Sequence, residues 1–526
     1  MAKVFISAKL SPEGINVLKN AGLSFKESEP LNGSDLVRAM QGYDALIVRS
    51  ESKITADVIK GCPSLRVVGR AGTGVDNIDV EAATQAGVIV MNAPGGNTVT
   101  TAEHTFALML AAARSIPQGH MKLAQGTFDR KLKGIELEGK VLGIVGLGQI
   151  GRVVARKAAG FGMRVIGHDP YCPEDIARSL SVELMPLNDL FARADIVSVH
   201  VPKTSETGNL IDAAAIDRMK NGAMLINCAR GGLVDEQAVR AALDSGKLGA
   251  AAFDVFSVEP PPPGHPLVDH PKCVVTPHLG ASTEEAQVNV ARIVAESVVD
   301  FLKTGAVRGA VNLPAISPQV YAEIKPFVEL GQQLGSFIAQ ASRTDAITSL
   351  TVKYRGKVAE RSTDYVFRSV LSGYLKHRTE DVNSVNAPAI AKRFGFTVTE
   401  THETGEHPGL GGLCVSIKSK LGERSVEGTV FDPATMRITR YDGFAIDVPP
   451  RGTMLLMRNE DVPGVVGHVG NFFGKEKINI AGFYLGRKDN GGEAVALIEI
   501  DGALTQSQLD AFGKLPHVRS VKLVRL

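Results

Sequence analysis

The sequence predicts an α/β protein with parallel sheets in its first part and a smaller α+β unit at its end. Three observations favour this fold class. Short apolar runs alternate with helix-like segments over residues 1–95, and this alternation returns after residue 140. A G-x-G-x-x-G spacing starts at Gly146, between an apolar run and a helical pattern. Residues 453–526 follow the order β-α-β-β-α-β. The alternation is typical of parallel sheets covered by helices, and the last pattern is typical of one small sheet.

The first 95 residues are expected to form a parallel sheet. Its predicted strands are short and apolar, at Val4–Ser7, Ala45–Val48, Leu65–Val68 and Val88–Met91. The segment Asn92-Ala-Pro-Gly-Gly-Asn97 then interrupts the alternation, because Pro and Gly favour turns. A long apolar helix is expected over Thr98–Ala113.

The glycines Gly146, Gly148 and Gly151 follow the predicted buried strand Val141–Val145. Gly146 allows a tight turn, Gly148 lets a pyrophosphate approach the backbone, and Gly151 lets helix and strand pack closely. The N-terminus of the next helix offers free N–H groups and a partial positive charge to that pyrophosphate. The segment therefore predicts a dinucleotide site.

Asp169 follows the next predicted strand, Arg164–His168. A carboxylate at this position can accept hydrogen bonds from the adenosine ribose, and it would repel a 2′-phosphate. The expected cofactor is therefore NAD rather than NADP. Later strands of this region are expected at Ile196–His200, Ala223–Asn227, Ala250–Val255 and Cys273–Thr276.

The dinucleotide motif starts late, which predicts that its domain is inserted into another one. The segment after about residue 283, with a predicted helix at Glu284–Thr304, is expected to return and complete the first domain. Two crossings of this kind form a hinge and a cleft, where small-molecule sites tend to lie. The predicted domains are 1–97 with 284–314 for substrate, 98–283 for NAD, 317–450 as an intervening domain, and 453–526 as a ferredoxin-like unit.

The composition argues against several classes of protein. A net charge of +2 over 526 residues offers no general attraction for nucleic acid or an anionic membrane. No apolar run reaches the roughly 18 residues of a membrane span, and the chain starts directly with a strand, which leaves no room for a signal peptide. No metal site is predicted. The cysteines are far apart and are expected to be reduced thiols of a cytoplasmic protein, at Cys62, Cys172, Cys228, Cys273 and Cys414.

Arg230, Glu259 and His278 follow predicted strands of the nucleotide half, where ligands bind in open α/β sheets. An arginine can hold a substrate carboxylate through two hydrogen bonds, and a histidine beside a carboxylate can take a hydroxyl proton. Each residue also has a structural interpretation, as an ion pair, a turn cap or a hydrogen-bonded loop histidine. His168 and His200 end strands too, so position alone does not select His278. His104, on the long apolar helix, is expected to be a packed core residue.

Four motifs occur in a characteristic order: Gly146-x-Gly148-x-x-Gly151, Cys228-Ala-Arg-Gly-Gly232, Ser257-Val-Glu-Pro260 and Thr276-Pro-His-Leu-Gly-Ala-Ser-Thr283. This order resembles the D-isomer-specific 2-hydroxyacid dehydrogenases. The resemblance implies a Rossmann-type NAD domain inserted into a flavodoxin-like substrate domain. It also implies catalytic roles for the arginine, glutamate and histidine of these motifs. The segment Arg70–Asn77 and a terminal unit similar to an ACT domain narrow the resemblance to long members that oxidise 3-phospho-D-glycerate to 3-phosphooxypyruvate, the first step of phosphorylated L-serine biosynthesis.

The same resemblance implies contacts with ligands. The residues implied for NAD are Thr73, Gly146, Gly148, Gln149, Ile150, Gly151, Asp169, Cys228, Ala229, Arg230, Asp254, His278, Leu279, Gly280 and Ala281. Those implied for substrate are Arg49, Arg70, Asn97, Arg130, Arg230 and His278, with Arg130 reaching across a subunit contact or lying in a solvated charge run. A 3-phosphate needs cations beyond Arg230, which is consistent with this set.

The terminal unit has residues suited to an amino-acid effector such as L-serine. Asp461 is expected to meet its ammonium group, and Asn459 and Asn479 its carboxylate or hydroxyl. The alternative is a dimerising sheet without a ligand. The protein is expected to be a homotetramer or homodimer. Two other functions stay open at this point: a related dehydrogenase of glycerate, 2-hydroxyglutarate or hydroxypyruvate, and a non-catalytic scaffold that senses NAD.

Overall fold

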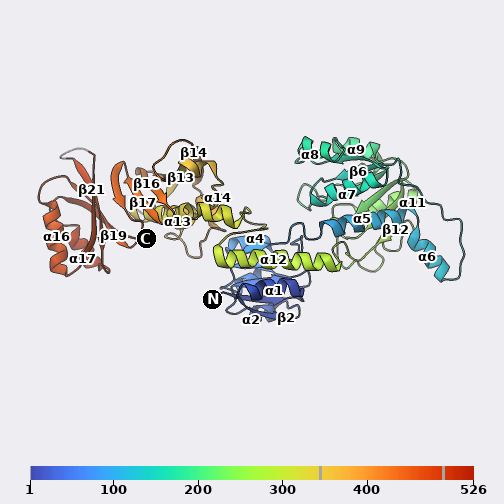
Figure 1. Ribbon diagram of the computed structural model, residues 1–526, viewed down its shortest axis with the longest axis horizontal. Coiled ribbons are helices and arrows are strands. Elements are labelled where there is room, and N and C mark those ends of the chain that lie inside the picture. The colour runs from blue at the N-terminus through green and yellow to red at the C-terminus, as the bar shows by residue number, and fades with distance from the viewer. Residues whose placement is uncertain (1, 343–345, 489–491) are drawn as a thin grey trace.

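The computed structural model describes residues 2–342, 346–488 and 492–526. Within these residues the strands form four sheets. Figure 1 shows the blue N-terminal unit in the middle of the molecule, with the teal and green second unit on one side and the yellow-to-red third and fourth units on the other. Two sheets are parallel, one is mixed and the last is antiparallel. The predicted fold class is therefore confirmed.

The first sheet is parallel and has the strand order β2-β1-β3-β4-β5, the order of flavodoxin-like folds. Its strands are β1 (Lys3–Ser7), β2 (Ser24–Ser28), β3 (Ala45–Val48), β4 (Val67–Arg70) and β5 (Ile89–Met91). The helices between them are α1 (Pro12–Asn20), α2 (Gly33–Ala39), α3 (Ala56–Lys60) and α4 (Val80–Gln85). An apolar layer lies on each face of this sheet.

The first sheet is completed by residues that follow the second one. Helix α12 (Glu284–Thr304) packs on α1 and on the sheet, so closely that a Cβ at Gly69 would lie 2.8 Å from Val294. Beyond α12 the chain returns to the edge strand β5, where the Val311 N–H donates to the Val90 carbonyl at 2.8 Å. Figure 1 shows α12 directly above α1, although the whole second unit separates them in the sequence.

The second sheet is parallel and has the order β12-β11-β10-β9-β6-β7-β8. Its strands are β6 (Val141–Val145), β7 (Arg164–His168), β8 (Val182–Leu184), β9 (Ile196–Val199), β10 (Ala223–Asn227), β11 (Leu248–Phe253) and β12 (Cys273–Val275). Its helices are α5 (Thr98–Ala113), α6 (Ile116–Ala124), α7 (Gln149–Gly160), α8 (Glu174–Ser179), α9 (Leu187–Arg193), α10 (Ala213–Arg218) and α11 (Glu236–Ser245). The strand order reverses between β6 and β9, which is the switch point where Rossmann folds bind dinucleotides.

The third sheet is mixed and has the order β14-β13-β15-β16-β17-β18. Its strands are β13 (Ile347–Arg355), β14 (Thr397–Glu403), β15 (Gly411–Ser419), β16 (Gly422–Asp432), β17 (Thr435–Tyr441) and β18 (Phe444–Val448). Its helices are α13 (Pro318–Ala341), α14 (Asp364–Leu375), α15 (Ala387–Phe394) and the short 3₁₀ helix Gly356–Glu360. Helices α13 and α14 pack against each other, and α13 lies on the sheet.

The fourth sheet is antiparallel and has the order β20-β21-β19-β22. Its strands are β19 (Thr453–Glu460), β20 (Ile480–Arg487), β21 (Glu493–Ile500) and β22 (Val518–Arg525), with helices α16 (Val465–Glu476) and α17 (Gln506–Phe512). One face packs on these helices. Met454, Leu456 and Leu497 on the other face join the core of the third sheet. The intervening and C-terminal units therefore share one apolar core.

The intervening unit also docks on the first sheet's unit. The Asn383 amide donates to the Gly87 carbonyl at 2.9 Å, and the Asn386 amide donates to the Gln85 carbonyl at 3.2 Å. The Tyr365 hydroxyl donates to the Pro314 carbonyl at 2.6 Å. These bonds join the two units through polar contacts around a shared apolar cluster.

Two further findings concern the predictions from composition. All five cysteines are free, and Cys62, Cys228 and Cys273 are buried. Burial raises the pKa of the Cys228 and Cys273 thiols to about 12, so both remain protonated near neutral pH. In the described part of the chain no helix is long and apolar enough to cross a membrane.

Candidate active site

A cleft of about 770 Å³ lies between the first and second units, lined by residues at the carboxyl ends of strands from both. It gathers most of the residues expected to bind ligands or to take part in catalysis. These are Arg49, Arg70, Thr73, Asn97, Ile150, Cys228, Ala229, Arg230, Asp254, Glu259, His278, Gly280 and Ala281. The two units meet at this cleft because the chain crosses between them twice, before α5 and before α12.

His278 and Glu259 form a direct pair in the cleft. His278 Nδ1 lies 2.7 Å from Glu259 Oε2, and both side chains are partly exposed. The other carboxylate oxygen of Glu259 accepts the Phe256 N–H at 3.0 Å. With Nδ1–H donating to the carboxylate, the imidazole Nε2 is left to accept a proton from a ligand.

The loop that carries His278 is built around the buried carboxylate of Asp254. Its Oδ1 accepts the Leu279 N–H at 2.7 Å and its Oδ2 accepts the Gly280 N–H at 2.8 Å. Although burial opposes its charge, hydrogen bonds from His104, Thr276 and Leu279 keep the pKa of Asp254 below its usual value. Asp254, expected to contact NAD, thus also holds the histidine loop.

His104 differs from the prediction of a packed core residue. Its Nε2 lies 3.0 Å from Asp254 Oδ1 and 3.1 Å from Thr276 Oγ1, and its side chain is partly exposed. The apolar sequence of α5 favoured a core position for His104. Its polar partners could not be predicted, because they follow strands that are distant in the sequence. His104 belongs to the polar network beneath the His278 loop.

Arg230 lies in the loop after β10 and reaches toward the other unit. Its Nε is 3.1 Å from Asp76 Oδ2, which makes an ion pair across the cleft. Gly231 permits the close approach of the next loop, since a Cβ at that position would lie only 1.7 Å from the Phe256 carbonyl oxygen. Asp76 was not predicted as an ion-pair partner, although it belongs to the quoted segment Arg70–Asn77.

Arg49 and Arg70 add further positive charge from the first sheet. Burial and the neighbouring charge of Arg230 lower the pKa of Arg70, and Arg49 contributes in the same direction. Arg70 Nε and Asn97 Oδ1 are buried atoms that have no hydrogen-bond partner among the described residues. Because buried polar groups are nearly always paired, these two atoms indicate that a polar ligand completes the site.

The glycine loop has the geometry that a dinucleotide needs. Gly146 has a φ of 98°, and a Cβ at Gly151 would lie 2.0 Å from the Gly146 carbonyl oxygen. A Cβ at Gly148 would meet no atom within 4 Å, so this side of the loop is open at the start of α7. Asp169 Oδ2 accepts the Leu147 N–H of the loop at 2.8 Å. The residues present therefore fit NAD.

A second pocket of about 290 Å³ adjoins this loop and is lined by His168, Asp169, Pro170, Leu184, Met185 and Pro186. Its apolar walls beside Asp169 suit an adenine ring next to its ribose. Gln149 lies at the other end of the loop, where its side-chain oxygen accepts the Thr98 hydroxyl at 3.3 Å. The glycine loop thus connects the adenosine pocket to the segment that crosses between the units.

The environments of three strand-end histidines differ. His168 Nδ1 bonds to the Met185 carbonyl at 3.0 Å. His200 Nε2 bonds to the Ser198 hydroxyl at 2.8 Å, and burial lowers the pKa of His200 to about 4, which keeps it neutral. Of the three, His278 has a carboxylate partner, which can orient the imidazole and stabilise its protonated form.

Some predicted site residues lie outside the cleft. Arg130 is exposed on the segment after α6, and the cleft of its own chain does not include it. Asn459 is buried, its amide donates to the Glu460 carbonyl, and its Oδ1 has no partner among the described residues. Asp461 Oδ2 is paired with Arg487 at 3.1 Å, and the Asn479 amide donates to Asp501 at 2.7 Å.

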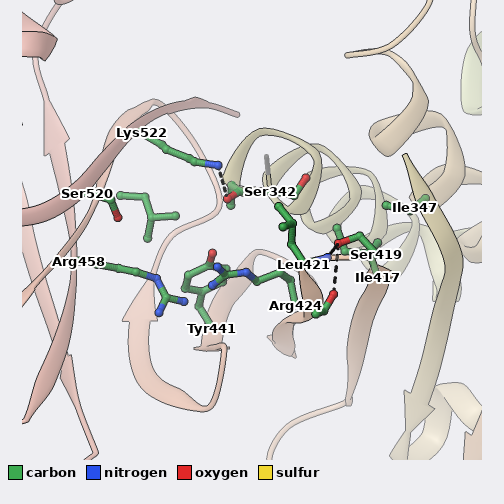
Figure 2. Close-up of a pocket in the computed structure, with 13 residues that line it drawn as sticks. Ser342, Ile347, Ile417, Ser419, Leu421, Arg424, Tyr441, Arg458, Ser520 and Lys522 are labelled. Carbon is green, nitrogen blue, oxygen red and sulfur yellow. Dashed lines mark hydrogen bonds between the residues drawn. The ribbon is translucent and has the colours of Figure 1, made fainter. Parts of the chain in front are cut away.

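Another pocket, of about 290 Å³, lies at the seam between the third and fourth sheets. Figure 2 shows Arg424 and Arg458 approaching it from the two units, beside Tyr441. Asp442 accepts hydrogen bonds from both guanidinium groups. The Arg458 guanidinium also lies over the Tyr441 ring, 5.6 Å from its centroid. This group of side chains ties the two units together.

Comparison with known proteins agrees with the site geometry. The family described as "D-isomer specific 2-hydroxyacid dehydrogenase, NAD binding domain" matches residues 106–280. Among solved structures, the TT0316 protein from Thermus thermophilus is 35% identical, with a TM-score of 0.54 over 59% of this chain and 99% of that one. The apo D-lactate dehydrogenase from Escherichia coli is 27% identical, with a TM-score of 0.53 over 59% of this chain and 100% of that one. The fold and the site define an NAD-dependent dehydrogenase of 2-hydroxy acids.

The similarity extends beyond that catalytic part. The "D-3-phosphoglycerate dehydrogenase intervening domain" family matches residues 323–441. The D-3-phosphoglycerate dehydrogenase of Bacillus subtilis (strain 168) is 41% identical over 531 residues, covering 100% of both chains. That of Archaeoglobus fulgidus is 40% identical over 530 residues, again covering 100% of both. The chain belongs to the D-3-phosphoglycerate dehydrogenases.

Proposed function

We propose that this chain oxidises 3-phospho-D-glycerate to 3-phosphooxypyruvate with NAD, as the first step of phosphorylated L-serine biosynthesis. One observation carries the proposal. The His278–Glu259 pair lines the same cleft as three arginines, Arg49, Arg70 and Arg230. A proton acceptor supported by a carboxylate suits the oxidation of a hydroxyl group, and the arginines suit a substrate with both a carboxylate and a phosphate.

In the proposed reaction Arg230 holds the C1 carboxylate, and Arg49, Arg70 and Asn97 bind the remainder of the substrate, with the two arginines on the phosphate. His278 accepts the proton of the C2 hydroxyl as that oxygen becomes a carbonyl. The Glu259 carboxylate orients the imidazole and stabilises its positive charge. NAD, when bound, supplies the acceptor for the hydride that leaves C2. In the reverse direction His278 returns the proton.

The chain holds NAD through groups on both sides of the glycine loop in this proposal. The residues around Gly146–Gly151 bind the pyrophosphate, Asp169 binds the adenosine ribose, and the loops at Thr73, Cys228–Arg230 and Asp254 with His278–Ala281 surround the nicotinamide end. Residues 98–283 then act as the NAD domain, while 1–97 with 284–314 act as the substrate domain. The protein is proposed to work in the cytoplasm, where its free thiols stay reduced.

His278→Ala is expected to lower kcat about 100- to 10,000-fold in both directions, because it removes the general acid and base. NADH oxidation with 3-phosphooxypyruvate, followed by absorbance, measures the effect. NADH binding, followed by its fluorescence, should remain unchanged. Turnover retained at the wild-type level in this variant would refute the base assignment.

The phosphate assignment has a separate test. Arg49→Ala is expected to lower kcat/KM for 3-phosphooxypyruvate about 10- to 100-fold, the effect of losing one charge-assisted hydrogen bond. The rate with unphosphorylated hydroxypyruvate should change much less. Arg38→Ala, on an exposed helix of the same unit, is the matched control. An unchanged preference for the phosphorylated substrate would favour a dehydrogenase of glycerate or hydroxypyruvate instead.

The proposed assembly is a homo-oligomer, a dimer or a tetramer of the chain. Exposed apolar side chains gather on α6 and the segment after it, at Ile116, Met121, Leu123, Phe128, Leu132 and Ile135. Several exposed apolar side chains on one short segment favour protein contacts. Arg130 lies on the same segment, which supports its reaching the cleft of a second copy. Mass measurement of the native protein and of Phe128→Asp tests the contact, and an unchanged mass would count against it.

The C-terminal unit is proposed to bind L-serine as an effector. Asp461 would exchange its Arg487 partner for the ligand's ammonium group, and the unpartnered Asn459 Oδ1 and the Asn479 amide would bind its polar groups. L-Serine is expected to inhibit the NADH-dependent reaction, and Asp461→Asn should weaken this inhibition. If millimolar L-serine does not change the rate of the wild-type reaction, the effector proposal fails and the C-terminal unit has only a structural role.

A further inference from the structure

Glu236 is a largely buried carboxylate one loop away from the catalytic pair. It is the first residue of α11, where the helix dipole favours a negative charge. Its Oε1 accepts both the Ser257 N–H and the Ser257 hydroxyl at 2.7 Å, and its Oε2 lies 2.9 Å from His265 Nε2. The side chains of Glu236 and His265 are 12% and 5% exposed, so water has little access to the bond between them.

The hydrogen bond at Nδ1 determines which ring nitrogen of His265 carries the proton. The Leu267 N–H donates to His265 Nδ1 at 3.3 Å, so Nδ1 is an acceptor. Nε2 therefore carries the hydrogen and donates it to Glu236. The Phe256 ring packs edge-to-face on the His265 imidazole, 5.1 Å between ring centroids. Glu236 and His265 thus clamp residues 256–257 from the side remote from the cleft.

The clamped residues contact the catalytic machinery on their other side. The Phe256 N–H donates to Glu259 Oε1, the oxygen that does not bind His278. The Phe256 carbonyl packs on Gly231, beside Arg230. One dipeptide therefore connects the Glu236–His265 pair to both the proton-transfer pair and the arginine.

We infer that Glu236 and His265 are positioning residues for the dehydrogenase reaction. They hold Phe256 and Ser257 so that the Glu259 carboxylate keeps the orientation in which it supports His278. The same contacts keep Arg230 at a fixed distance from His278. This inference rests on the roles proposed for Glu259 and His278. Neither Glu236 nor His265 lines the cleft, so their effect passes through the loop.

Glu236→Gln keeps the size of the side chain and changes its hydrogen bonding. Whichever way the new amide turns, its N–H₂ faces either the His265 Nε2–H or the Ser257 N–H, and two donors repel each other. His265 cannot resolve the conflict by moving its proton to Nδ1, because Nδ1 already accepts from Leu267. We expect kcat to fall about 10- to 100-fold, the effect of disturbing an outer partner or of a displacement near 1 Å. The KM for NADH should stay within about twofold.

A double variant separates positioning from general loosening. If Glu236 acts through Glu259, Glu236→Gln should lower kcat by less than about twofold in a Glu259→Gln background, because the interaction it protects is already lost. Asp244→Asn is the matched control. Asp244 lies on the same helix and pairs with the buried His270, whose Nδ1 likewise accepts a backbone N–H. That pair joins α11 to residues 270–272, and its loss should leave kcat unchanged.

The inference is overturned if Glu236→Gln keeps the wild-type kcat. It is also overturned if Glu236→Gln lowers kcat equally in the wild-type and Glu259→Gln backgrounds, or if Asp244→Asn lowers kcat as much as Glu236→Gln does. Thermal unfolding of every variant shows whether a loss of kcat merely follows a loss of folded protein. The assay of His278→Ala serves as the reference. If that variant stays active, the proposed roles of the pair fail; if it is inactive while Glu236→Gln is normal, the positioning inference alone fails.

Discussion

His278 has a φ of 55°, in the left-handed region that a residue with a side chain occupies at a cost of about 1–3 kcal/mol. The Asp254 carboxylate offsets this cost, because it accepts the two N–H groups that follow His278. Such a charge-assisted pair of bonds persists only while Asp254 is ionised, and its lowered pKa keeps it so. The unusual backbone and the buried carboxylate therefore form one feature.

His200 makes folding stability depend on pH. Its pKa is about 4 in the folded protein and 6.5 ordinarily, so between these values the unfolded chain binds more protons and stability falls as the pH is lowered. When the pH is lowered from 7 to 4.5, we expect the free energy of unfolding to fall by about 2 kcal/mol less in His200→Gln than in the wild type. The full shift of the pKa would give a larger difference, but His200 lines the cleft and is only partly shielded from water. Urea unfolding at both values measures the difference, and equal losses would contradict it.

The sequence identified Arg230, Glu259 and His278 as candidates because each follows an apolar strand within a specific motif. Asp76, His104 and Glu236 were not identified, since their contacts join residues far apart in the chain. Their positions look ordinary in the sequence: an exposed loop, an apolar helix and the first turn of another helix. Contacts between side chains that are far apart in the sequence leave no pattern in the residues around them.

Among the elements, those with strong apolar patterns were the best predicted. Helices α5 and α12 have the expected bounds, as do β3, β6, β7 and β10. Strand β2 was missed because it is an edge strand with a largely exposed sequence, Ser24–Ser28. Strand β4 runs two residues later than expected and therefore ends at Arg70 itself. Edge position and exposure explain the first miss, since hydrophobic periodicity is the main signal.

The seam between β16 and β19 depends on Asp442, which joins Arg424 to Arg458. Asp442→Asn is expected to destabilise the protein by about 2 kcal/mol, because two partly buried guanidinium groups would then face each other without a shared carboxylate. Asp447→Asn removes an exposed ion pair with Arg437 and should cost less than about 0.5 kcal/mol. Urea unfolding compares the two variants, and equal effects would show that the seam gains nothing from Asp442.

At the scale of the molecule, the late glycine motif predicted an inserted nucleotide unit, and the pairing of Val311 with Val90 brings the chain back to the first sheet. The arrangement of the last two units could not be predicted in the same way. Alternation along β19 places Met454 and Leu456 on one face and Leu455 and Met457 on the other. The sequence shows that both faces are apolar but not which unit covers each.

This return of the chain has a consequence for synthesis. A chain is synthesised from its N-terminus, so the strands of the first sheet emerge from the ribosome before α12 has been made. Helix α12 covers Gly69 of that sheet through Val294 and Val298. All strands of the second sheet lie between α5 and α12, and they are available earlier than that cover. We therefore expect the inserted unit to fold first on the ribosome, as domains generally fold as units. The N-terminal sheet would stay sensitive to protease in nascent chains stalled before α12 emerges and become resistant in those stalled after it.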